Sequence, residues 1–190
     1  MKNVLVALLV ITVAFVGFIA TRPTNYHVER SMSFAAPPQA AYAQIADFHR
    51  WDAWMPWNKL DPAMKKEYGG APSGTGATYH WVGNDKVGEG NMAIKNATEP
   101  SNVDIQLDFL KPMQATCDTK FAIAPEGTGS KVTWSIDGKN SFMGKAMCVF
   151  MGGMDKMMGP DFEKGLSAMK TAAETAAPVA ADSSATPTKS

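Results

Sequence analysis

The feature that most constrains this chain is an apolar segment at its N-terminus. Residues 4–20 read VLVALLVITVAFVGFIA, in which only Thr12 and Gly17 interrupt the apolar run. A helix of this length, rising ~1.5 Å per residue, would reach ~26 Å, close to the ~30 Å hydrocarbon thickness of a bilayer. We therefore expect residues 1–22 to form an uncleaved membrane anchor, with residues 4–20 inside the bilayer.

Two other interpretations of this segment stay open, a cleaved signal peptide and a core helix of a soluble domain. A signal peptide usually has a shorter apolar region, of roughly 7–15 residues, and cleavage after residue 20 would place Phe18 where a small residue is required. Basic residues flank the segment almost equally, with Lys2 before it and Arg22 and Arg30 after it, so the positive-inside rule gives little guidance. The short N-terminal tail is typical of a signal-anchor and favours an extracytoplasmic domain, periplasmic in a bacterium.

Charge and composition exclude several classes of protein. The chain has 18 Lys+Arg and 18 Asp+Glu, so its formal net charge is zero and gives no electrostatic basis for binding nucleic acid. Two cysteines exclude a disulfide-rich scaffold and a four-cysteine zinc site. Residues 176–190 read AAPVAADSSATPTKS and are predicted to form a disordered tail, because they cannot bury enough surface to offset their ordering entropy. A folded unit over residues 25–175 remains.

Most of this unit is predicted to consist of short strands. The expected strands span residues 26–34, 65–68, 78–82, 87–97, 102–109, 115–123 and 131–136, with one short helix over residues 39–47. In the strand over residues 102–109, Val103, Ile105, Leu107 and Phe109 alternate with polar residues. Such alternation in consecutive strands predicts an antiparallel sheet with one covered face.

A methionine-rich helical pattern follows the last strand. Residues three or four apart, as on one face of a helix, are Met143, Met147, Met151, Met154 and Met158. Phe150 widens this stripe, Gly152-Gly153 is expected to kink it, and Gly159-Pro160 is expected to break it before a final helix over residues 161–175. The predicted fold is therefore α+β, with a curved antiparallel sheet wrapped around a long C-terminal helix that covers it, preceded by one transmembrane helix.

Local motifs resemble those of a known superfamily. The segment FHRWDAWMPW at residues 48–57 looks like the helical entry loop of the SRPBCC superfamily, and GTGATYHW at residues 74–81 resembles the strand that follows in that superfamily. The likeness covers roughly residues 26–174 and includes FEKGL at residues 162–166. This superfamily includes START-like lipid carriers and the polyketide cyclase/dehydrase and lipid transport family. The resemblance implies a helix-grip fold that encloses an apolar cavity between the sheet and the C-terminal helix.

The methionine stripe admits three interpretations. It is a packed core face, or it is an adaptable lid over a ligand pocket, because methionine is flexible and polarizable, or it is a Cu(I) site built from thioethers. The glycines at positions 144, 152 and 153 would loosen a lid, whereas no histidine lies in the stripe to complete a copper site. The residues predicted to line the cavity are Trp54, Trp57, Phe109, Phe121, Trp134, Met143, Met147, Phe150, Met151, Met154 and Met158.

Candidate chemistry is sparse elsewhere. No HExxH, GxSxG or phosphate-loop motif occurs, and we expect no metal and no cofactor. Glu67, His80 and Glu89 are weak acid–base candidates on strands that could line the cavity. Cys117 is expected to face the covered side of the sheet and Cys148 to lie on the methionine-rich helix, so that the two either form a disulfide or remain separate thiols.

These observations predict a membrane-anchored domain that binds a hydrophobic small molecule or lipid and carries out no chemistry of its own. The alternative is a polyketide cyclase/dehydrase-like enzyme that uses acid–base residues in the same cavity.

Overall fold

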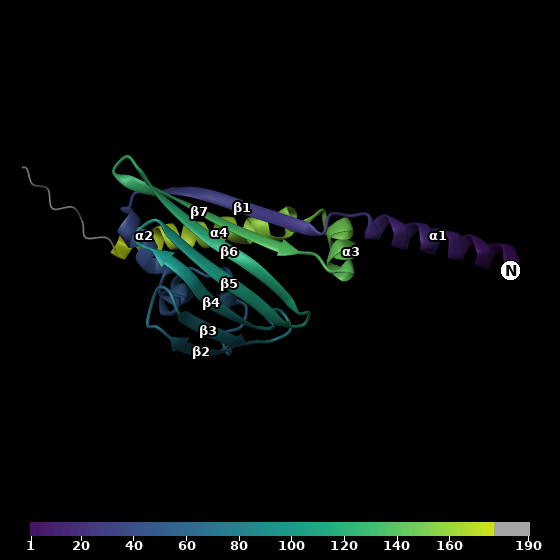
Figure 1. Ribbon diagram of the computed structural model, residues 1–190, viewed down its shortest axis with the longest axis horizontal. Helices are drawn as coiled ribbons and strands as arrows, with labels where there is room; N and C mark the ends of the chain where they lie inside the picture. The colour runs from purple at the N-terminus through teal and green to yellow at the C-terminus, as the bar shows by residue number, and fades with distance from the viewer. Residues whose placement is uncertain (177–190) are drawn as a thin grey trace, which may run out of the picture.

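The computed structural model describes residues 1–176, so the predicted tail lies outside the described residues except for residue 176. Its elements, labelled in Figure 1 and numbered along the chain, are α1 (Lys2–Ala20), β1 (Asn25–Phe34), α2 (Pro38–Ile45), the 3₁₀ turns η1 (Phe48–Ala53) and η2 (Pro56–Lys59), β2 (Lys65–Gly70), β3 (Ala77–Val82), β4 (Glu89–Thr98), β5 (Asn102–Lys111), β6 (Ala115–Glu126), β7 (Gly129–Lys139), α3 (Phe142–Met151) and α4 (Met154–Ala176).

The seven strands form one antiparallel sheet in the order β1-β7-β6-β5-β4-β3-β2. Strands β2 to β7 therefore pair with their neighbours in the chain, while β1 pairs with the last strand, as in Asn25↔Lys139 and Phe34↔Ser130. Alternation fixes the faces as predicted, because in β6 Cys117, Thr119, Phe121 and Ile123 are all buried. These four side chains share one face, which α4 and the helical turns cover.

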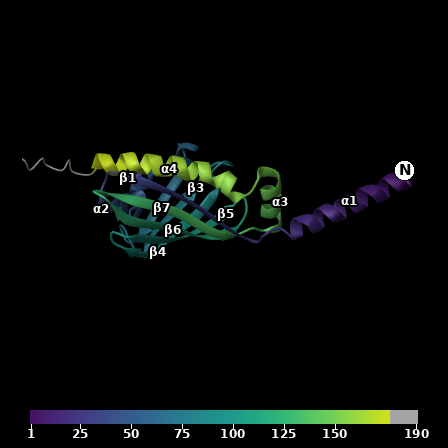
Figure 2. The ribbon, with the colours of Figure 1, turned by 90° about the horizontal axis from the view of Figure 1, so that it is seen from above.

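Helix α4 runs along the covered face of the sheet, as the view from above shows (Figure 2). Phe162, Leu166, Met169 and Ala173 recur at helical spacing and are buried in the core. The predicted α+β helix-grip architecture is confirmed. The predicted break at Gly159-Pro160 is wrong, since α4 continues through Pro160.

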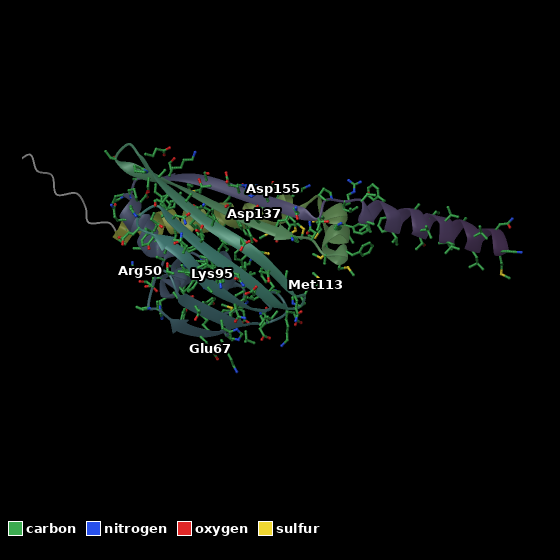
Figure 3. The ribbon with its side chains drawn as sticks, viewed as in Figure 1. Arg50, Glu67, Lys95, Met113, Asp137 and Asp155 are labelled. Carbon is green, nitrogen blue, oxygen red and sulfur yellow. The ribbon has the colours of Figure 1, made fainter. Side chains whose placement is uncertain are left out.

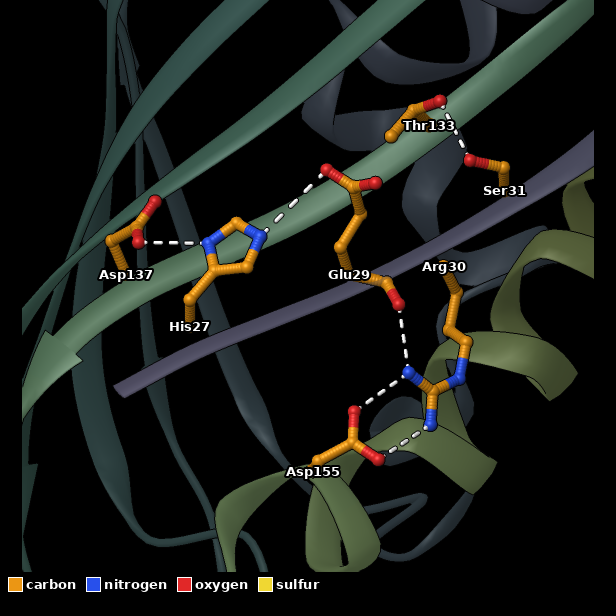
Figure 4. A network of polar contacts seen from close by, with 7 residues as sticks. All are labelled: His27, Glu29, Arg30, Ser31, Thr133, Asp137 and Asp155. Atoms are coloured by element: carbon orange, nitrogen blue, oxygen red, sulfur yellow. Dashed lines mark hydrogen bonds and ion pairs between the residues drawn. The ribbon is translucent and has the colours of Figure 1, made fainter. Parts of the chain in front are cut away.

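An ion-pair cluster joins the start of α4 to the edge strand β1. Arg30 Nη1 lies 2.7 Å from Asp155 Oδ1, and Arg30 Nε lies 2.8 Å from Glu163 Oε1 (Figure 4 shows the pair with Asp155). The guanidinium crosses Gly159, where an added Cβ would clash with Arg30 Nη2. The smallest residue at this position therefore allows α4 to approach β1 closely enough for both ion pairs. Elsewhere on β1, His27 Nδ1 lies 2.8 Å from Asp137 Oδ1 on the neighbouring strand β7 (Figure 4).

Helix α3 does not cover the sheet, which corrects the prediction that the whole methionine-rich segment, kinked at Gly152-Gly153, covers it. The backbone turns at Gly152 and Gly153, whose φ values of 84° and 100° lie in the left-handed region that favours glycine. This reversal separates α3 from α4 and places α3 beside the end of α1, away from the sheet face (Figures 1 and 2). No residue of α3 is buried.

Candidate ligand cavity

A cavity of about 300 Å³ lies between the covered face of the sheet and the first half of α4. Strands β3, β4, β5, β6 and β7 supply its floor, and η2, the segment before β2 and the start of α4 supply its cover. In β3, Tyr79 and Trp81 point inward because they alternate with the outward-facing His80. Most of the wall consists of aromatic rings, methionines and aliphatic side chains.

Stacked aromatic rings hold one wall of the cavity in place. The indole of Trp134 stacks on the ring of Phe162 with centroids 4.1 Å apart and planes 7° from parallel. Trp57 meets Trp134 edge to face at 6.1 Å. On the opposite wall, Trp81 stacks on Tyr79 at 5.9 Å. Aromatic pairs of these geometries add about 0.5–1.5 kcal/mol each to simple burial, so this wall is largely preformed.

Two buried polar atoms of the cavity wall have no hydrogen-bond partner among the described residues, the hydroxyl of Tyr79 and the indole nitrogen of Trp134. Tyr79 is 6% exposed and Trp134 3% exposed. Burial raises the pKa of Tyr79 above its ordinary value, so its hydroxyl stays protonated at neutral pH. Both groups are thus hydrogen-bond donors in an apolar surrounding, where an unmade hydrogen bond costs about 1–3 kcal/mol.

The rim of the cavity is polar and lies at one end of the sheet. Lys86, in the β3–β4 connection, is exposed, and Asn58 and Asp161 contribute side chains that are half-buried. Met157 and Met158, in the first turns of α4, also line the cavity. The cavity therefore opens between the β3–β4 connection and the start of α4.

The structure distributes the predicted lining residues over three places. Trp57, Phe109, Trp134 and Met158 lie in the cavity wall. Trp54 and Phe121 are completely buried in the core behind the wall, where Trp54 Nε1 donates to the carbonyl of Gln44 at 3.1 Å. Met154 packs against the core outside the cavity wall.

The remaining four predicted residues lie on α3, outside the cavity, and correct the prediction. These exposed side chains are Met143, Met147, Phe150 and Met151. A periodic apolar stripe shows that a helix has an apolar face, but it does not show which surface that face meets, and the turn at Gly152-Gly153 redirects this one. The stripe is thus neither a packed core face nor a cover over the cavity along α3.

Sequence reasoning missed several wall residues, including Tyr79, Trp81, Met55, Met64 and Met92. The alternation Ala77, Tyr79, Trp81 within β3 was the available signal for the first two. Met55 and Met64 lie outside regular strands and helices, where periodicity gives no direction.

The three weak acid–base candidates lie on the outer face of the sheet, which corrects their expected place in the cavity. Glu67 pairs in register with His80, and His80 Nδ1 lies 2.7 Å from Asn91 Oδ1. Glu89 forms an ion pair with Lys111 at 2.6 Å, and the hydrogen bond from Lys111 lowers the pKa of this carboxyl. The strands line the cavity as expected, but a period of two places alternate side chains on opposite faces.

Neither cysteine forms a disulfide in the structure. Cys117 is buried, and its Sγ shares a hydrogen bond with the Tyr26 hydroxyl at 3.0 Å, while burial raises the pKa of the thiol. Cys148 is half-buried on α3 and its Sγ lies 3.9 Å from Asn140 Oδ1. Within residues 1–176, no group of three His, Cys, Asp or Glu side chains could hold a metal ion.

Helix α1 alone among the helices of the described residues is long and apolar enough to cross a membrane. A membrane anchor and a signal sequence share this property.

Solved structures of other proteins share this fold. Protein CV1439 from Chromobacterium violaceum superposes with a TM-score of 0.56 at 11% identity, covering 80% of this chain and 99% of its own. Protein MLL2253 from Mesorhizobium loti gives a TM-score of 0.56 at 11% identity, covering 80% of this chain and 100% of its own. DynU16, from the dynemicin biosynthetic locus, gives a TM-score of 0.53 at 15% identity, covering 80% of this chain and 48% of its own. At these identities the likeness concerns the fold.

A search of curated proteins finds no significant match. The sequence model of one family, described as polyketide cyclase/dehydrase and lipid transport, matches residues 26–174, from the first strand to the end of α4. The match spans most of the chain and coincides with the sheet, the cavity and the helix that covers them. The chain therefore belongs to the polyketide cyclase/dehydrase and lipid transport family, which is of the SRPBCC type.

Proposed function

We propose that the protein is a membrane-anchored binding protein that holds a hydrophobic small molecule or lipid in the cavity between its sheet and α4. The observation that carries this proposal is the wall of the cavity, which is built from aromatic rings and methionines held by mutual stacking. The cavity has a volume of about 300 Å³, at the lower end of the ~300–1,000 Å³ typical of ligand pockets. A long ligand would therefore extend through the rim.

The unpartnered donors narrow the class of ligand. The Tyr79 hydroxyl and the Trp134 indole N–H each need an acceptor. Both atoms are covered by neighbouring side chains, so a ligand would have to displace these side chains to offer a carbonyl, carboxyl or ether oxygen as the acceptor. A pure hydrocarbon would leave both donors without a partner. We therefore propose an oxygen-bearing lipid or polyketide-like molecule as the ligand.

Binding without chemistry is the function that the wall supports best. Glu67, His80 and Glu89 would have to reach the bound molecule to act as acids or bases, and all three side chains lie on the other face of the sheet. Membrane attachment is supported by the length and apolar sequence of α1. In this proposal α1 remains attached to the mature protein.

Native mass spectrometry of the full chain, extracted from membranes in mild detergent, tests the proposal. The wild-type protein should retain a reproducible co-purified molecule. Leu107→Trp places a large ring in the cavity wall and should remove that molecule, whereas Gln106→Trp, on the opposite face of the same strand, should not. A wild-type cavity that stays empty after exposure to total membrane lipid would contradict the proposal. Chemical conversion of the bound molecule would point to the enzyme instead.

A further inference from the structure

Helix α3 presents an unusual amount of apolar surface to solvent. Phe150 is 75% exposed, and Phe142, Met143, Met147 and Met151 are exposed as well. Soluble domains rarely leave so many large apolar side chains together without a partner surface. These side chains stay exposed although α3 contacts both the end of α1 and the start of α4.

The apolar surface of α3 is continuous with that of α1. The rings of Phe15 and Phe150 lie with centroids 5.9 Å apart, and Lys145 Nζ lies 3.4 Å from the carbonyl oxygen of Ala20. Figures 1 and 2 both show α3 beside the C-terminal end of α1. At ~1.5 Å per residue, Phe15 lies about 7–8 Å along α1 from Ala20. If α1 spans a bilayer, Phe150 reaches a similar depth, which is the ~5–10 Å depth of helices that lie in a membrane interface.

The charges around α3 match a phosphate-rich surface. Between Asp137 and Asp155, which pair with His27 and Arg30, the chain contains Lys139 and Lys145 and no acidic residue. Arg22, just beyond α1, lies with its guanidinium 3.8 Å from the ring centroid of Phe18. These three cations lie where lipid headgroups would meet the end of a membrane-spanning α1, and each basic residue near an anionic leaflet contributes about 1 kcal/mol.

The rim of the cavity lies at the same end of the sheet. In an antiparallel order, the β3–β4 connection, the β5–β6 connection, the end of β7 and the start of β1 all lie at one end. Lys86 of the rim belongs to the first of these connections, and the exposed Met113, labelled in Figure 3, belongs to the second. The start of α4, which carries Met157, follows α3 directly.

We propose that α3 is a membrane-interface helix, which binds a phospholipid surface through Phe142, Met143, Met147, Phe150 and Met151 and holds the rim of the cavity against the bilayer. This inference rests on the proposed anchoring by α1. A ligand would then pass between the membrane and the cavity without crossing bulk water.

Depth-dependent fluorescence quenching tests this inference on the full chain in phosphatidylcholine–phosphatidylglycerol vesicles. Single-cysteine variants, made in a Cys117→Ser/Cys148→Ser background, carry an environment-sensitive fluorophore at one of three positions. Phe150→Cys reports on α3, Val10→Cys on the middle of α1, and Lys95→Cys on the exposed outer face of β4. Nitroxide lipids labelled near the headgroup or deep in the acyl chain act as quenchers.

We expect the label at position 150 to be quenched several-fold more strongly than that at position 95, and more by the shallow than by the deep nitroxide. The label at position 10 should be quenched most by the deep nitroxide. Deep quenching at position 10 with none at position 150 would overturn the interface helix and leave the anchor intact. A blue-shifted but unquenched label at position 150 would assign the surface to a second copy of the chain. No quenching at either position would overturn anchoring and the inference together.

Discussion

Removing the unpartnered hydroxyl of Tyr79 should have opposite effects on the stability of the ligand-free protein and on its affinity for the ligand. Tyr79→Phe removes one oxygen and keeps the ring, which stacks on Trp81 at 5.9 Å and lies 5.8 Å from the ring of Phe48. In the ligand-free protein the change removes a buried donor without an acceptor, so the free energy of unfolding should stay the same or rise by up to about 1–3 kcal/mol. In the complex it would remove the hydrogen bond that we propose Tyr79 donates to the ligand.

That lost hydrogen bond sets the expected change in affinity. A net contribution of about 0.5–1.5 kcal/mol corresponds to a dissociation constant raised about 2- to 13-fold. Urea unfolding of the delipidated protein measures the stability, and quenching of the tryptophans in the cavity wall measures the binding. Since burial raises the pKa of Tyr79, the hydroxyl should donate throughout the neutral range, and the wild-type affinity should not change with pH there.

Tyr26→Phe is the matched control. The Tyr26 hydroxyl shares a hydrogen bond with Cys117 Sγ at 3.0 Å outside the cavity wall, so its loss should destabilise the protein by about 0.5–1.5 kcal/mol and leave ligand binding unchanged. The reasoning about Tyr79 fails if Tyr79→Phe destabilises the ligand-free protein as much as Tyr26→Phe does. It also fails if the affinity of Tyr79→Phe equals that of the wild type.

Three further predictions concern the cover of the cavity and the outer face. Leu166→Ala, at a fully buried position of α4, should lower the free energy of unfolding by about 2–5 kcal/mol in urea titrations, whereas Lys164→Ala, at an exposed position, should change it little. The hydrogen bond from Arg30 lowers the pKa of Asp155 in the folded protein. The ionised carboxylate therefore stabilises the fold above its unfolded pKa of ~3.9, and this stabilisation is lost as pH falls through the lower folded pKa. Arg30→Met should thus lower the melting temperature at pH 7 more than at pH 3. His80→Gln should leave ligand affinity unchanged in the fluorescence titration, and a clear loss would return His80 to the candidate site.

The sequence was sufficient for the strands and insufficient for the place of the methionine stripe. Apolar residues at alternate positions, such as Val103, Ile105, Leu107 and Phe109, identify the buried face of a strand. In a sheet of sequential hairpins, the buried faces of all strands meet the same cover. Four of the seven aromatic residues in the cavity wall lie on strands and follow this alternation, namely Tyr79, Trp81, Phe109 and Trp134. The position of α3 depends on a backbone turn at Gly152-Gly153, and glycines allow a kink as readily as a reversal.

The acid–base candidates failed for a related reason. Glu67, His80 and Glu89 have acid–base side chains on or beside strands that line the cavity, but residue type alone does not say which face of the strand each side chain occupies. Tyr79 and Trp81 set that parity in β3, and His80 between them must therefore point away from the cavity. The unpartnered donors, in contrast, could not be predicted, because a missing acceptor is a property of the surrounding three-dimensional packing.

The pairing of β1 with β7 determines when this domain can finish folding. Asn25 must find Lys139, and Phe34 must find Ser130, so the first strand of the sheet has no partner until almost the entire domain has been synthesised. Until then both sides of β1 are unpaired, whereas in the folded sheet β7 covers one of them; unpaired strand edges are the kind of surface on which strands of other chains add. Because α1 directly precedes β1, a nascent chain attached through α1 would hold this open edge at the membrane while the remaining strands emerge. The first strand of the chain thus acquires its partner last, and the order of synthesis decides how long it stays unpaired.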